Sequence, residues 1–391
     1  AWSYPGNLAG YAAPTIIEAD GAQYGISFQA KDFAGQMSAA ATNYVILDRI
    51  GPTVTVSTPM AAPDQYYGPA RPMAQLRGNA SDTPAGVERV MVQVQNLDDS
   101  SFWHVGTAQW VVASSSYAVA VGTNPWTLAG PAFINNKRYR ASAFGVDTAG
   151  NASGTPTDRD FLYDANKPSS TILSPSAAFQ PRNQPTVISG TARDVVNLGS
   201  ETAGLVDRVE IAIQETVSGN YWKGTVGNGG FASGQTYRVT ASTPGQTPVP
   251  WSYPAFGDTI PPWQDGVNYT VRTRVFDRSY NQEAVDQSFS FTYDQTSPTT
   301  TVTSPVSASY VQSMSTVSGG FTEAFGLARV QVAVQRQDNL YWDGAAFTVD
   351  GAALPPVWFD AAVWQSTWSF YDAEFAAQFA LQPGVVQYVV W

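Results

Sequence analysis

The sequence predicts an all-β fold, a series of antiparallel β-sandwich domains arranged as an elongated rod. The 391 residues are 43% hydrophobic and only 13% charged, with 33 Gly and 26 Pro, and this composition favours strands and turns over helices. One pattern also recurs about every 120 residues, as the positions of Trp103, Trp222 and Trp342 show. That period exceeds the roughly 40–50 residues of a propeller blade and fits a sandwich of about seven strands.

Each repeat begins with a short strand closed by proline and ends with a hairpin. In the first complete repeat, the expected elements are a threonine-rich strand before Pro59, a second strand at 76–82, an alternating strand at 87–95, an aromatic pair at 102–103, a strand at Trp126 and the closing hairpin from Tyr139 to Tyr163. The alternation at 87–95 puts one face on a core and the other in water. The same order returns twice further along the chain.

The closing hairpin turns at Asp147, in the stretch DTAGNAS. An aspartate at a strand end accepts backbone N–H groups in an Asx-turn, and we expect Gly150 and Asn151 to take positive-φ positions. Asp32 and Asp277 occupy the same place in the neighbouring copies. We therefore assign Asp32, Asp147, Gly150, Asn151 and Asp277 to a structural turn.

The joints after these hairpins divide the chain into four parts. Residues 1–48 have the pattern of the last strands of an incomplete domain, 49–164 and 165–294 are complete domains, and 295–391 lack the last strands. Two interpretations of the ends remain open. Residues 1–391 are a window of a longer continuous chain, or the first strands of one copy complete the last domain of the next and build a head-to-tail filament.

The turn at Asp147–Ser153, the Y-D-x-x-x-P joint and the following T-x-x-x-x-P strand resemble the bacterial Ig-like or fibronectin-III-like tandem repeats of large exported surface proteins. The resemblance covers the whole chain. It implies Ig-like domains, an extracellular or cell-surface location and a structural part in a filament, sheath, stalk or giant surface protein. Partners would be copies of the chain or its own continuation, and surface glycans are an alternative.

Acidic residues gather at the predicted joints and are weak candidates for interdomain calcium ligands. Hard cations require several oxygens at about 2.3–2.6 Å, which carboxylates supply. The competing explanation is that these residues only form turns, since no D-x-D-x-D-G spacing occurs. The candidates are the pairs Asp48 with Asp82, Asp164 with Asp194, and Asp294 with Glu323, which would assist the turn aspartates Asp32, Asp147 and Asp277 as ligands.

Several function classes lack support in the sequence. There is no cysteine, and His104 is the only histidine, so neither thiolate metal sites nor a catalytic triad is expected. A net charge of −11 without a basic cluster disfavours nucleic acid. No run of about 18 apolar residues predicts a membrane span. We expect a non-enzymatic structural protein, with an adhesin that binds carbohydrate or calcium as the alternative, and an accessory part of a secreted enzyme as a third.

Overall fold

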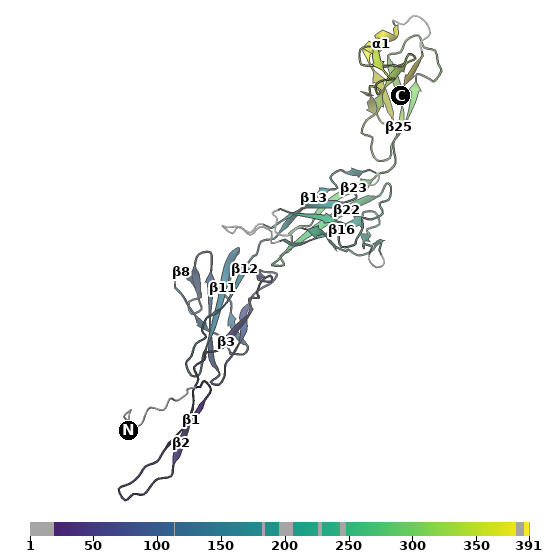
Figure 1. Cartoon of the computed structure of the whole chain (residues 1–391). Helices are drawn as coiled ribbons and strands as arrows, with labels where there is room; N and C mark the ends of the chain where they lie inside the picture. Colours follow the sequence, from purple (N-terminus) through teal and green to yellow (C-terminus); the bar gives the residue numbers. More distant parts are fainter. Residues whose placement is uncertain are drawn as a thin grey trace.

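A computed structural model describes residues 19–112, 114–181, 184–194, 206–225, 229–242, 248–380 and 387–390. Three β-sandwiches follow one another along the chain, and a two-stranded hairpin extends beyond the first of them (Figure 1). Antiparallel sheets dominate, and the described part holds one helix, α1 (Ala373–Ala380). The predicted all-β chain of tandem sandwiches is thereby confirmed. No helix in these ranges has the length and hydrophobicity needed to cross a membrane.

The N-terminal hairpin pairs β1 (Gln23–Phe28) with β2 (Ala41–Ile46) in antiparallel register. Its turn is an Asx-turn, since the Gln36 amide donates to Asp32 Oδ1 at 2.8 Å. Both strands are exposed along nearly their whole length, including Phe28 and Tyr44. Residues 1–18, the first part of the segment 1–48 that is expected to hold the last strands of an incomplete domain, lie outside the described residues.

The first sandwich contains two sheets, one in the order β10-β5-β3 and one in the order β4-β12-β11-β6-β7-β8, with β9 paired to β6. The alternating burial of β3 and β5 puts every second side chain into the core between the sheets. The strands are β3 (Thr53–Thr58), β4 (Tyr66–Tyr67), β5 (Gln75–Ser81), β6 (Val87–Asn96), β7 (Ser101–His104), β8 (Gln109–Val112), β9 (Ala118–Val119), β10 (Trp126–Ala129), β11 (Lys137–Asp147) and β12 (Thr157–Tyr163).

The second sandwich repeats this arrangement, with β13-β15-β21-β20 facing β14-β23-β22-β16-β17-β18 and β19 paired to β16. Its strands are β13 (Ser169–Ser174), β14 (Phe179–Gln180), β15 (Ile188–Arg193), β16 (Val206–Glu215), β17 (Tyr221–Trp222), β18 (Phe231–Ala232), β19 (Arg238–Val239), β20 (Ala241–Ser242), β21 (Val249–Tyr253), β22 (Asn268–Asp277) and β23 (Gln287–Tyr293).

The third sandwich has the sheets β24-β25-β32-β31, β26-β30 and β29-β28-β27-β33. Tyr388 in β33 lies opposite Arg336 as Tyr139 lies opposite Asn96 in the first sandwich. The strands are β24 (Thr299–Ser304), β25 (Thr316–Thr322), β26 (Gln331–Val332), β27 (Val334–Arg336), β28 (Leu340–Trp342), β29 (Phe347–Asp350), β30 (Phe359–Asp360), β31 (Ala362–Trp364), β32 (Thr367–Tyr371) and β33 (Tyr388–Val390).

Each sandwich encloses its own hydrophobic core, and the repeated aromatic residues fill these cores. Trp222 and Trp342 of the aromatic pairs are buried, and Trp103 packs against the first core from a half-buried position. Trp126, Trp251 and Trp368 are buried as well. The recurrence of these aromatics is therefore explained by packing, since each large ring buries about 150–250 Å². His104 is half-buried on β7, where its ring lies 2.9 Å from the Ser114 carbonyl oxygen.

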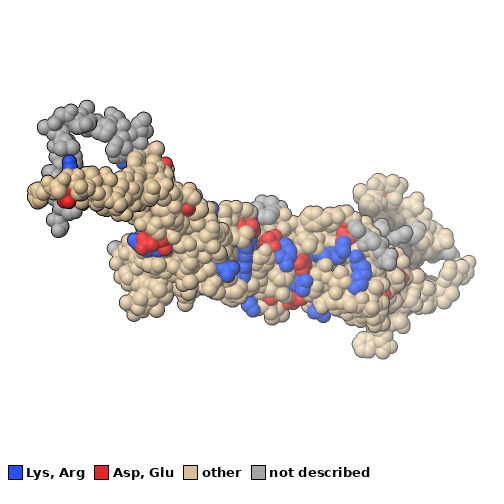
Figure 2. Space-filling view, turned by 90° about the horizontal axis from the view of Figure 1, so that it is seen from below, with Lys and Arg blue, Asp and Glu red and all other residues tan. Residues whose placement is uncertain are grey.

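Charges of both signs alternate on the outer strands of the sandwiches. Figure 2 shows Lys and Arg interleaved with Asp and Glu across one face. On β11 and β12, Arg140 lies between Asp158 and Asp160, and on β16 and β22, Glu210 lies between two arginines. Such partly exposed pairs contribute little stability, but they keep this face free of a patch of one sign.

Candidate metal centre at the domain junctions

The turn of each closing hairpin returns to the joint that precedes its own sandwich. The side-chain amide of Asn151 donates to the Asp48 carbonyl oxygen at 3.0 Å, and Asn281 donates to the Asp164 carbonyl oxygen at the same distance. The two amides also donate to the carboxylates of the turn aspartates, Asp147 and Asp277. The hairpin turn therefore holds the linker at each junction.

The Asx-turns have the expected backbone, with one correction. The backbone amide of Asn151 donates to Asp147 Oδ1 at 2.8 Å, and Gly150 has a φ of +95°. Asn151 was expected at a positive φ as well, but only the glycine has one. The asparagine acts through its side chain instead, because its amide can join the turn aspartate to the linker at once.

Three carboxylates converge at each of these two junctions. One comes from the joint, one follows the second strand of the sandwich and one ends the first strand of the closing hairpin. In each group the carboxylate oxygens lie within 4.8 Å of one another. The groups are Asp48 with Asp82 and Asp147, and Asp164 with Asp194 and Asp277.

The group at the second junction is the more deeply buried. Asp164 and Asp277 are fully buried and Asp194 is 4% exposed. Asp164 Oδ1 accepts the Asn166 amide at 2.8 Å, whereas Asp164 Oδ2 has no hydrogen-bond partner among the described residues. A buried carboxylate oxygen without a donor costs free energy. A cation among the three carboxylates would remove that cost, so the arrangement calls for a positive charge.

Calcium fits this donor set best. It binds six to eight oxygens at about 2.3–2.6 Å, so its ligand atoms lie within roughly 5 Å of one another. In each group one oxygen of every carboxylate lies within 4.8 Å of the others, which is compatible with that geometry. The described part of the chain supplies neither thiolate nor imidazole to either group, so the ligand chemistry favours a hard cation over a transition metal.

Burial and the charges of neighbouring carboxylates raise the pKa of several members of these groups. Burial raises the pKa of Asp277 to about 6, against the hydrogen bonds from Asn281 that lower it, and the charge of Asp164 adds to the rise. Burial also raises the pKa of Asp164. At the first junction, burial and the charges of Asp48 and Asp147 raise the pKa of Asp82. Burial also acts to raise the pKa of Asp147, but hydrogen bonds from Asn151 outweigh it and hold this pKa below its usual value.

The third predicted pair, Asp294 and Glu323, forms no such group in the described structure. Asp294 Oδ1 accepts the Thr296 amide at 3.0 Å, and Glu323 Oε1 accepts the Phe325 amide at 3.0 Å. In the other sandwiches the third carboxylate ends the strand that corresponds to β33. The described part of β33 ends at Val390, before that position is reached.

The structure brings together the acidic residues that the calcium hypothesis places at the first two junctions. The calcium hypothesis joins Asp147 to the pair Asp48 and Asp82, and Asp277 to the pair Asp164 and Asp194, although the sequence alone favours the turn as the role of Asp147 and Asp277. In the structure each turn aspartate accepts from the backbone amide of its asparagine and also lies in the carboxylate group. The signal was present in the repeat, because a hairpin that closes a sandwich beside its own first strand returns to the joint.

Comparisons with known proteins return structures but no sequence family. No protein-family model matches the chain, and no curated protein matches it. The chain is similar to the FN1–FN3 domains of chicken CNTN1, at 10% identity and a TM-score of 0.28 over 87% of this chain and 91% of that one. It is also similar to a tetra-tandem repeat in the extending region of a large adhesion protein, at 15% identity and a TM-score of 0.27 over 90% and 74%. A 1.5-MDa bacterial ice-binding adhesin matches at 12% identity and a TM-score of 0.29 over 84% and 89%. The function is therefore argued from this chain's own geometry.

Proposed function

We propose that this chain is a structural, non-enzymatic part of an extracellular surface protein, in which tandem sandwiches act as a spacer stiffened by calcium at the junctions. The observation that supports the proposal is the junction itself. Three equivalent carboxylates and an equivalent asparagine recur at both of these junctions. In each case the side-chain amide of the asparagine lies 3.0 Å from the linker carbonyl oxygen. Everything that repeats with the sandwiches thus serves packing or the connection between them.

Calcium would connect groups that belong to different parts of the rod. In the second junction, Asp164 belongs to the linker after the first sandwich, while Asp194 and Asp277 belong to the second. An ion bound to all three would restrict the angle between the two bodies. Without it, mutual repulsion among three carboxylates would favour a looser joint.

Small-angle X-ray scattering with saturating calcium and with EGTA would test the spacer. We expect a larger maximum dimension and a narrower distance distribution with calcium, and no calcium response in the double variant Asp82→Asn/Asp194→Asn. Glu323→Gln is the matched control, because Glu323 has the same place in the third repeat without a carboxylate group around it. A calcium response that survives in the double variant would contradict the proposal.

The exposed hairpin β1–β2 suggests how the rod is continued. Its counterparts β11–β12 lie against β6 with most of β11 buried, whereas β1 and β2 are exposed among the described residues. We propose that the exposed faces of this hairpin pack against a further sandwich, supplied by the same polypeptide or by another copy joined head to tail. Native mass measurement separates the two, since single copies at all concentrations would contradict assembly from copies.

A further inference from the structure

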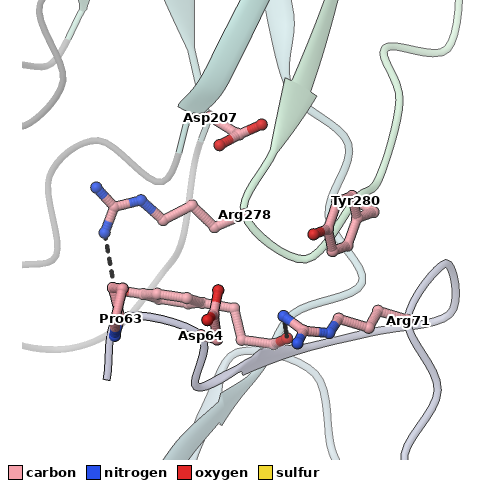
Figure 3. A pocket seen from close by; sticks show the side chains of 7 residues that line it. Pro63, Asp64, Arg71, Asp207, Arg278 and Tyr280 are labelled. Atoms are coloured by element: carbon pink, nitrogen blue, oxygen red, sulfur yellow. Dashed lines mark hydrogen bonds between the residues drawn. The ribbon is translucent and has the colours of Figure 1, made fainter. Parts of the chain in front are cut away.

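A pocket of about 250 Å³ lies where the first sandwich meets the second. Figure 3 shows Pro63, Asp64 and Arg71 on one side and Asp207, Arg278 and Tyr280 on the other. Tyr66 completes the lining. The volume is below the roughly 300–1,000 Å³ of sites for drug-sized ligands, and it matches a single ring with its substituents.

Two residues of the second closing turn build this pocket, and the first turn has nothing comparable. The first turn reads DTAGN and the second reads DRSYN, so Arg278 and Tyr280 stand where the first turn has Thr148 and Gly150. Tyr280 has a φ of +64°. A bulky residue in that region is an outlier that costs about 1 kcal/mol or more over glycine. Strained backbone of this kind concentrates at binding sites.

The two arginines contact the tyrosines of the pocket. Arg278 Nη1 donates to Tyr66 Oη at 3.1 Å, and the guanidinium of Arg71 lies 5.4 Å from the Tyr280 ring centre. Neither arginine forms an ion pair with a described residue, although Asp64 and Asp207 line the same pocket; Asp207 pairs with Arg208 at 2.9 Å. Tyr280 remains 50% exposed.

These groups match the parts of one kind of ligand. Guanidinium groups bind carboxylates with paired, charge-assisted hydrogen bonds. Aspartates accept from hydroxyl groups, and an exposed aromatic ring offers a flat apolar surface to the C–H face of a sugar. We propose that the pocket binds a carboxylated sugar, a hexuronic acid residue of an acidic polysaccharide. Arg278 and Arg71 would hold the carboxylate, Asp64 and Asp207 the hydroxyl groups, and Tyr280 the ring.

Saturation-transfer NMR titrations of the whole chain at constant calcium would test this assignment. The probes are methyl β-glucuronide, methyl β-glucoside, which differs from it only in the carboxylate, and acetate. We expect the glucuronide to bind at least about tenfold more tightly than either of the other two. Equal binding of the glucoside would overturn the role of the acid, and equal binding of acetate would overturn the role of the sugar.

Three variants connect the binding to this pocket. Arg278→Gln should weaken glucuronide binding at least about tenfold. Tyr280→Gly should weaken it about threefold to tenfold without loss of folding, because glycine is the residue of the first turn and suits a positive φ. Arg159→Gln, at a half-buried arginine of the first sandwich that does not line the pocket, should leave binding unchanged. Unchanged binding in both pocket variants would contradict the proposal, and neither result bears on the calcium-stiffened spacer.

Discussion

Gly78 lies directly opposite Trp126 across strands β5 and β10, and the indole covers the glycine. A Cβ at Gly78 would come within 1.8 Å of the Thr55 carbonyl oxygen and 2.6 Å of Trp126 Cζ2. The same contact recurs at Gly190 with Trp251 and at Gly319 with Trp368. A large ring placed over a strand glycine fills the space that a missing side chain leaves.

We therefore expect Gly78→Ala to destabilise the first sandwich by about 2–4 kcal/mol, because backbone and a buried indole must both move. Urea unfolding followed by tryptophan fluorescence measures the change. Gly154→Ala in the same sandwich is the matched control, since no atom lies within 4 Å of its added Cβ, and it should stay within about 0.5 kcal/mol of the parent. Equal effects of the two substitutions would contradict the packing argument.

The fold was predictable because each repeat carries the same sequence pattern of strands and turns. Period-two alternation, prolines at the joints and a hairpin motif in several copies each indicate strands and turns, and their agreement fixes a tandem sandwich. The covered glycines were not recognised, because a glycine in a strand looks the same whether a ring lies over it or not. Helix α1 also went unnoticed, since it falls in a variable loop between repeated strands.

The site was predictable only in part. The repeat suggests the pairs at the joints and the turn aspartates as possible ligands, but only the return of the hairpin in space shows that the three carboxylates lie together. The proposed sugar pocket could not be predicted from the sequence, because Arg71 and Arg278 belong to different sandwiches. They line one pocket only because of the angle between the first and second sandwiches. Sequence distance carries no information about that angle.

Asn281 should matter more for stability than its place in a turn suggests. Its buried amide donates both to the Asp164 carbonyl oxygen and to Asp277 Oδ2. Asn281→Ala leaves two buried acceptors without their donor, and we expect a loss of about 2–4 kcal/mol in the unfolding of the second sandwich. Asn79→Ala, at an exposed strand position, should cost less than about 0.5 kcal/mol. Similar losses of stability in both variants would show that the hydrogen bonds from the Asn281 side chain are unimportant.

Without calcium, the second junction should become less stable as the pH rises. The pKa of Asp277 is raised to about 6, so the folded state binds a proton more tightly than the unfolded state. Its contribution is complete below about pH 4 and is lost through about pH 6, with a magnitude of at most about 3 kcal/mol. Unfolding in EDTA at about pH 4 and about pH 7.5 measures this loss. The parent should lose more stability than Asp277→Asn, and equal losses would count against a buried, protonated Asp277.

Calcium should reverse that dependence, because the ion replaces the proton among the carboxylates. At neutral pH we expect two calcium ions per chain by titration calorimetry, one for each three-carboxylate group. At a free calcium concentration about 100 times the dissociation constant, each site would add about 2.7 kcal/mol to the stability of its junction. Asp194→Asn should lower the stoichiometry to one, and Glu323→Gln should leave it at two. A stoichiometry that falls in Glu323→Gln but not in Asp194→Asn would place the calcium away from the buried group around Asp164.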